Sequence, residues 1–118
     1  MGFSQVFEHI KNEDLIGYTY RLKRDGYRLV QISNTKKGNF HLIYNFDKNY
    51  ELLGLCLEIE EGEEIESISG IYPYAFLYEN ELQDLFGVKI SNMSIDFKGN
   101  LYKTSVKTPL NTDREQVL

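Results

Sequence analysis

The stretch FHLIYNFDKNYELLGLCLEI, residues 40–59, decides the fold that this sequence predicts. Its first half places large apolar residues at every second position: Phe40, Leu42, Tyr44 and Phe46. Its second half repeats this alternation with Leu53, Leu55, Leu57 and Ile59. A period of two is typical of a strand with one buried face, and the polar residues 47–49 between the halves supply a turn. The stretch therefore predicts two antiparallel strands with a shared apolar face.

A third strand is predicted on the N-terminal side of this pair. Residues 27–34 are rich in β-forming residues, and the polar, glycine-containing segment 35–39 is typical of a hairpin turn. The three strands together form an antiparallel meander. Residues 3–10 fit either a helical stripe or an edge strand, and we favour the strand.

Residues 12–26 carry the signals of a helix. Asn12 can cap its first turn, two acidic residues follow, and two basic residues precede the stop at Gly26. The apolar stripe of this helix consists of Leu15, Tyr18 and Leu22. We expect that stripe to pack on the sheet.

A second helix is predicted from Pro73, as its first residue, to Gly87, as its C-terminal stop. At 100° per residue, one face gathers Ala75, Tyr78, Leu82, Leu85 and Phe86, and the opposite side carries Glu81 and Asp84. Beyond it, alternation at Met93, Ile95 and Phe97 predicts a short hairpin that turns at residues 98–100. We therefore expect one α+β domain over residues 1–103 and an extended or disordered tail over residues 104–118.

Composition limits the functions that this chain can have. Its 118 residues suit a single domain. Its net charge of −5 does not favour binding to nucleic acid, which is a polyanion. Cys56 is the only cysteine, so the chain alone builds neither a disulfide nor a cysteine-ligated cluster. The acidic run at residues 58–66 is either a solvated turn at a strand end or a contact for a basic partner surface.

No segment approaches the roughly 20 apolar residues of a membrane span, and the N-terminus has no secretory or myristoylation signal. We therefore expect a soluble, cytoplasmic chain that reaches a membrane only through partner proteins.

Three acids in the second helix invite a metal or acid–base interpretation: Glu79, Glu81 and Asp84. Glu79 and Glu81 point about 200° apart on a helix, so only Glu81 and Asp84 are neighbours. Two carboxylates without a histidine supply too few ligands for a typical metal site. His9 and His41 stand far apart, and no serine lies in a nucleophile motif. The sequence therefore predicts no catalytic, metal or cofactor site.

The negative charge of this helix still requires compensation, because it carries no Lys or Arg and Asp84 lies in its last turn, where the helix dipole disfavours an anion. A basic residue of the same chain is one candidate: Arg28, Lys89 or Lys98. A basic patch on a partner is another. Glu79 or Asp84 can also hold backbone N–H groups of a neighbouring loop.

Aromatic residues crowd the start of the same helix, over residues 71–78. They exceed what one face of a short helix buries in a small domain, and exposed aromatic patches are typical of protein interfaces. In the alternative interpretation, Tyr72 and Tyr74 simply cover the meander.

The segment YENELQDLFGV, residues 78–88, resembles the signature of the 30-kDa-type subunit of respiratory complex I and of membrane-bound nickel-iron hydrogenases. Further similar segments are GYRLVQI at residues 26–32, SISGIYP at residues 67–73 and IDFKGNLY at residues 95–102. Asn80 stands where the complex I form usually has Arg, and the sequence ends soon after the signature. Both departures favour the short subunit of energy-converting, ferredoxin-linked hydrogenases.

The resemblance implies an α+β structural subunit without cofactors of its own, peripheral to the cytoplasmic face of the membrane. Its partners would be a catalytic large subunit and an iron-sulfur small subunit, which hold the nickel-iron centre and the iron-sulfur clusters. The residues expected at the partner interface are Tyr78, Glu79, Glu81, Asp84, Leu85, Phe86 and Gly87. The alternatives are a free-standing binding module that uses the aromatic patch for a small ligand or regulatory protein, and a small hydrolase that uses Glu79, Glu81 or Asp84.

Overall fold

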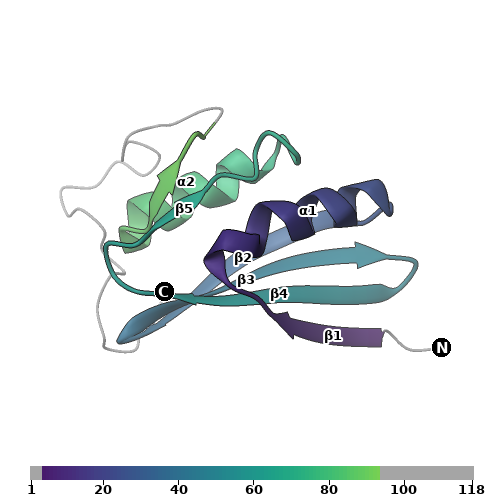
Figure 1. The fold of residues 1–118 in the computed structure, drawn as a ribbon, viewed down its shortest axis with the longest axis horizontal. Helices are drawn as coiled ribbons and strands as arrows, with labels where there is room; N and C mark the ends of the chain where they lie inside the picture. Colours follow the sequence, from purple (N-terminus) through teal and green to yellow (C-terminus); the bar gives the residue numbers. More distant parts are fainter. Residues whose placement is uncertain (1–3, 94–118) are drawn as a thin grey trace.

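The α+β fold of this chain rests on a four-stranded mixed sheet (Figure 1). A computed structural model describes residues 4–93. The sheet contains β1 (Ser4–His9), β2 (Arg28–Lys37), β3 (Asn39–Lys48) and β4 (Glu51–Ile59), in the spatial order β1-β4-β3-β2. Strands β2, β3 and β4 pair antiparallel, so the predicted meander is confirmed.

The fourth strand, β1, lies parallel to β4 at one edge of the sheet. The favoured strand at residues 3–10 is therefore confirmed for its described part, whereas its parallel pairing was not predicted. Phe7 pairs with Gly54, and a Cβ atom built on Gly54 would lie 2.9 Å from Phe7 Cδ1 and 3.2 Å from Ile43 Cγ2. The missing side chain of Gly54 thus lets the Phe7 ring lie across the strand.

We expect Gly54→Ala to lower the free energy of unfolding by about 1 kcal/mol, because the new methyl group pushes against the Phe7 ring. Urea unfolding measures this, and Phe7→Ala should cost less in the Gly54→Ala background than in the natural protein. Gly17→Ala is the control: its added Cβ meets nothing within 4 Å, so this helical position should gain stability. Additive effects of the Gly54 and Phe7 substitutions would contradict the contact.

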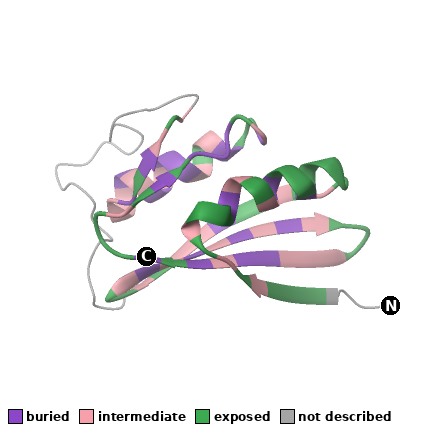
Figure 2. Cartoon of the chain, viewed as in Figure 1, coloured by how far each residue is buried: buried purple, intermediate pink, exposed green. Residues whose placement is uncertain are grey.

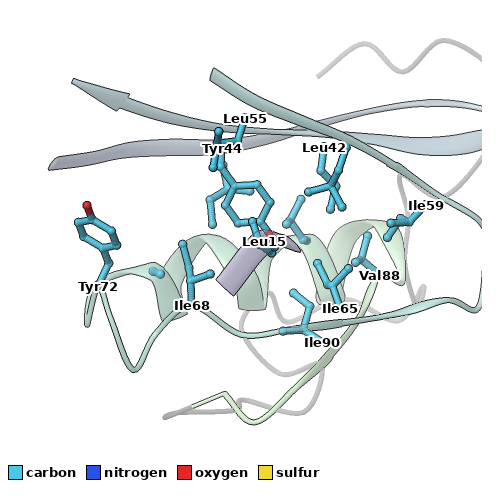
Figure 3. Close-up of a cluster of buried hydrophobic side chains, with 14 of the residues drawn as sticks. Leu15, Leu42, Tyr44, Leu55, Ile59, Ile65, Ile68, Tyr72, Val88 and Ile90 are labelled. Carbon is cyan, nitrogen blue, oxygen red and sulfur yellow. The ribbon is translucent and has the colours of Figure 1, made fainter. Parts of the chain in front are cut away.

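The alternation of residues 40–59 places its large side chains in the core. All four predicted residues of β3 are buried, as are Leu55, Leu57 and Ile59 of β4, while Leu53 is half-buried. Buried positions recur along these strands and again on the elements above them (Figure 2). Figure 3 shows side chains of the sheet meeting Ile65, Ile68, Val88 and Ile90 from the second layer. The core therefore lies between the sheet and one layer on its helical side.

Helix α1 (Leu15–Arg24) packs by its predicted stripe, since Leu15 and Leu22 are buried and Tyr18 packs half-buried against the core. Its start differs from the prediction, because a 3₁₀ turn, η1 (Asn12–Asp14), precedes it. The Asn12 side chain caps neither element. It donates instead to Glu63 Oε2 and to the Glu64 carbonyl, both at 2.9 Å, and so ties this turn to a distant loop.

Helix α2 (Ala75–Phe86) is the predicted second helix, two residues shorter at its start. Pro73 precedes the helix, and Tyr74 occupies the N-cap position. Gly87 ends the helix as predicted, with a φ of 79°, which a residue with a side chain rarely adopts. After this stop, β6 (Lys89–Ser91) pairs parallel with β5 (Glu64–Glu66), a small sheet that the sequence did not indicate.

The predicted C-terminal hairpin and the tail over residues 104–118 lie outside the described residues, as does the end of the predicted domain 1–103. Within residues 4–93, no helix has the length and apolar character that crossing a bilayer requires.

Candidate functional site: the signature helix and its loop

Glu79, in the middle of α2, is the most unusual residue of the signature because it is fully buried. Its Oε1 accepts a hydrogen bond from the Ser67 hydroxyl at 2.6 Å, and its Oε2 accepts one from the Ile68 N–H at 2.8 Å. Both donors belong to the segment between β5 and α2. The carboxylate therefore ties the helix to the loop that leads into it, as one of the sequence alternatives proposed.

The hydroxyls of Ser67 and Ser69 form a small hydrogen-bond network next to the Glu79 carboxylate. The Ser67 Oγ lies 2.7 Å from the Ser69 Oγ and accepts the Ser69 N–H at 3.0 Å. Both serines are buried. Both carboxylate oxygens and both serine hydroxyls thus have a hydrogen-bond partner, which fixes the loop's backbone.

The ionisation of Glu79 reflects this environment. Burial raises the pKa of its carboxyl from 4.5 to about 6, while the hydrogen bonds from Ser67 and Ile68 act in the opposite direction. Burial is the larger influence, so the neutral acid is favoured more than in a solvated glutamic acid.

Tyr44 of β3 lies buried on the sheet side of this network. Figure 3 shows its ring reaching from the sheet toward the second layer. Its hydroxyl has no hydrogen-bond partner among the described residues, and burial together with the charge of Glu79 raises the pKa of this phenol. A phenol that stays neutral here avoids placing a second negative charge near Glu79.

The other two acids of the signature, Glu81 and Asp84, differ in how far they are buried. They are the two acids predicted on the side of the helix opposite its apolar stripe. Asp84 is only 5% exposed, whereas Glu81 is half-buried, so that side is not a solvent face at Asp84. Asn80 is also buried and donates to the Phe76 carbonyl at 2.7 Å.

Within the described residues, the charge of Glu79 is not compensated by any of the basic residues that the sequence suggested. Neutral donors of the loop surround its carboxylate, as described above. Arg28, one of the proposed counterions, instead makes a two-point ion pair with Asp47, at 2.8 Å for each contact. Lys89 is exposed, and Lys98 lies outside the described residues.

The predicted interface residues are distributed between the interior and the surface. Glu79 and Asp84 are interior residues. The half-buried members are Tyr78, Glu81, Leu85, Phe86 and Gly87. The most exposed apolar side chains near this helix are those of Tyr74, at 77%, and Leu77, at 47%.

An aromatic groove opens beside the start of α2, with a volume of about 520 Å³. Its walls are Tyr27, Leu29, Tyr72, Pro73, Tyr74 and Tyr78, together with Lys23 and Arg28. Tyr72 is buried and packs against Phe46 of the sheet, with 5.5 Å between the ring centroids. The interpretation that the aromatic residues cover the meander therefore holds for Tyr72, whereas Tyr74 remains on the surface.

A metal-binding geometry does not occur within residues 4–93, where no three His, Cys, Asp or Glu side chains converge. The acids of the signature are distributed between the interior and the helix flank, and none of them lines the aromatic groove. The described site is therefore a rigid loop and helix next to an aromatic surface.

The fold and this loop define a small α+β domain whose signature acids belong partly to its interior. The family described as the 30-kDa subunit of respiratory-chain NADH dehydrogenase matches residues 3–116, and the chain belongs to that family. Comparison with curated proteins finds no matching relative.

A solved structure shares the fold. It is a chain in the structure of the membrane-bound sulfane sulfur reductase, an archaeal respiratory membrane complex, with a TM-score of 0.79 and 15% sequence identity. The match covers 90% of this chain and 67% of that one.

Sequence reasoning missed the donors that hold Glu79. The segment SIS at residues 67–69 predicts no role for its hydroxyls from the sequence pattern alone. The available signal is weak: serine side chains readily hydrogen-bond nearby groups, and a buried acceptor requires such a donor.

Proposed function

We propose that this chain is a non-catalytic structural subunit in the cytoplasmic arm of a membrane-bound nickel-iron hydrogenase or complex I-like oxidoreductase. It would hold a catalytic large subunit and an iron-sulfur small subunit in position for electron transfer coupled to ion transport. The nickel-iron centre and the iron-sulfur clusters would belong to those partners.

The observation that carries this proposal is the family match over residues 3–116, which includes the sheet, the loop and the signature. The fold shared with a chain of a respiratory membrane complex agrees with it. The departure at Asn80 favours the hydrogenase branch, as the sequence resemblance implies.

Burial divides the proposed interface residues into two roles. Tyr78, Glu81, Leu85, Phe86 and Gly87 retain exposed surface and would contact the partner. Glu79 and Asp84 would act from inside, by fixing the shape that this surface presents.

The direct test is to tag the chain in its native cells and to identify the proteins that co-purify from solubilised membranes. We expect a nickel-iron-type large subunit and an iron-sulfur subunit in stoichiometric amounts. Recovery of the chain without any oxidoreductase subunit would overturn the proposal. If the chain instead co-purifies with sulfur-reductase or quinone-linked subunits, its role as a subunit of an oxidoreductase complex stands, and the assignment to a hydrogenase is overturned.

We expect Leu77→Asp to lower the recovery of these partners about tenfold, because an acid placed on the apolar flank of α2 must be desolvated in the interface. Tyr20→Asp is the matched control, since Tyr20 is 62% exposed and belongs to α1, not to the signature helix. Circular dichroism of both variants checks that each remains folded. Equal recovery with the two variants would contradict an interface at Leu77.

Charge reversal at Asp84 is unsuitable for this experiment. The side chain is buried, so a lysine there would disturb folding before it could report on assembly.

A further inference from the structure

Three tyrosine hydroxyls of the aromatic groove already donate to partners within the chain. The Tyr72 hydroxyl donates to the Tyr27 carbonyl at 2.7 Å, and the Tyr78 hydroxyl donates to the Val30 carbonyl at 3.0 Å. The Tyr27 hydroxyl donates to Glu51. These bonds use the single hydrogen of each hydroxyl and hold the rings in place, so the remaining side-chain donors of the groove are its cationic residues and Tyr74.

The charged residues that line the groove are both cationic. The Lys23 ammonium lies 4.9 Å from the centre of the Tyr72 ring. Arg28 uses its Nε and Nη2 to bind Asp47, which leaves the N–H groups of Nη1 for another acceptor. Its side chain is 77% exposed.

The two lining cations contrast with the chain as a whole, which has 18 acidic and 13 basic residues, and Lys23 is the one that makes no ion pair with a described acid, since Arg28 already pairs with Asp47. A groove with cationic donors and fixed aromatic walls complements an occupant that carries carboxylates beside apolar groups. A basic or purely apolar occupant would leave Lys23 desolvated without an acceptor.

We propose that this groove binds an acidic, extended segment of a partner subunit, with carboxylates at Lys23 and Arg28 and apolar side chains against Pro73 and Tyr74. The groove lies directly before α2, so this docking continues the interface of the signature helix. The inference rests on the proposed function, because the segment belongs to a subunit of the same complex.

The test places the photoreactive residue p-benzoylphenylalanine at Tyr74 of the full chain in its native cells, with the same residue at Tyr20 as control. After irradiation, mass spectrometry identifies the crosslinked peptide in the purified complex. We expect the Tyr74 position to capture a segment of a co-purifying subunit with two or more acidic residues beside the crosslink. A segment without acidic residues, or no protein crosslink in an assembled complex, would overturn the inference and leave the proposed function standing.

A charge variant provides a second readout. We expect Lys23→Glu to reduce the recovery of the captured subunit by about fivefold at low salt, because it repels the acidic segment. Arg24→Glu is the matched control, since Arg24 is also exposed at the end of α1 but does not line the groove. Equal losses for both variants would indicate a general charge effect and contradict the groove. Absence of every oxidoreductase subunit from the natural protein's preparation would instead contradict the proposed function.

Discussion

Replacing Glu79 with alanine is expected to lower the free energy of unfolding by about 3 kcal/mol. The substitution leaves the Ser67 hydroxyl and the Ile68 N–H without their acceptor in a buried place. It also opens a cavity where a fully buried side chain stood. Urea unfolding of the natural protein and the variant measures the difference.

Glu79→Gln is the matched variant, because glutamine has the same shape and no charge. Its amide oxygen can accept the Ile68 N–H, and its NH₂ group can donate to the Ser67 Oγ if the Ser67 hydroxyl turns toward Ser69. We therefore expect a much smaller loss, below about 1 kcal/mol. Similar losses for the alanine and glutamine variants would show that the charge, and not the hydrogen-bonded shape, stabilises the loop.

The stability of this protein is expected to fall by about 2 kcal/mol between about pH 4 and about pH 7, through the titration of Glu79. The pKa of this carboxyl is 4.5 in the unfolded chain and about 6 in the folded protein. Between these values the folded state binds more protons than the unfolded state. Raising the pH therefore favours unfolding as it passes through these two values, and the effect is complete only about one unit above the folded pKa, near pH 7.

Other carboxyls act in a separate pH range. Arg28 holds the pKa of Asp47 below its ordinary value, and the Glu60 N–H and the Asn12 side chain lower the pKa of Glu63. Their contributions are lost only as the pH falls further, through these lowered values. The window above pH 4.5 thus isolates Glu79 from these two residues.

Urea unfolding at several pH values from 4.5 to 7 tests this expectation in the natural protein and in Glu79→Gln. The decline with pH should be present in the first and absent in the second. Both proteins contain the same two histidines, so the difference between the two curves reports on position 79. Parallel curves would contradict a raised pKa at this residue.

The sequence predicted the elements whose signal is a regular apolar period. The alternation of residues 40–59 identified two strands and their buried faces, and the stripe of α1 identified its packed side. Gly87 identified the end of α2, because glycine adopts the left-handed conformation of a helix end more readily than residues with a side chain.

Periodicity did not predict the site, since it treats every acid as a surface residue. Glu79 and Asp84 are buried, and the donors that hold Glu79 lie in a segment 11 to 12 residues earlier in the chain. The contact depends on how the loop folds back on the helix. The parallel partner of β1 escaped prediction for a related reason, because strand pairing over such a distance has no local pattern.

The contact between Glu79 and Ser67 closes the intervening chain into a ring, and Tyr72, Pro73 and Tyr74 of the groove lie within it. A closed ring has already lost much of the conformational entropy that a free loop would give up on association. One buried carboxylate, which no occupant of the groove touches, therefore preorganises the surface that the occupant meets.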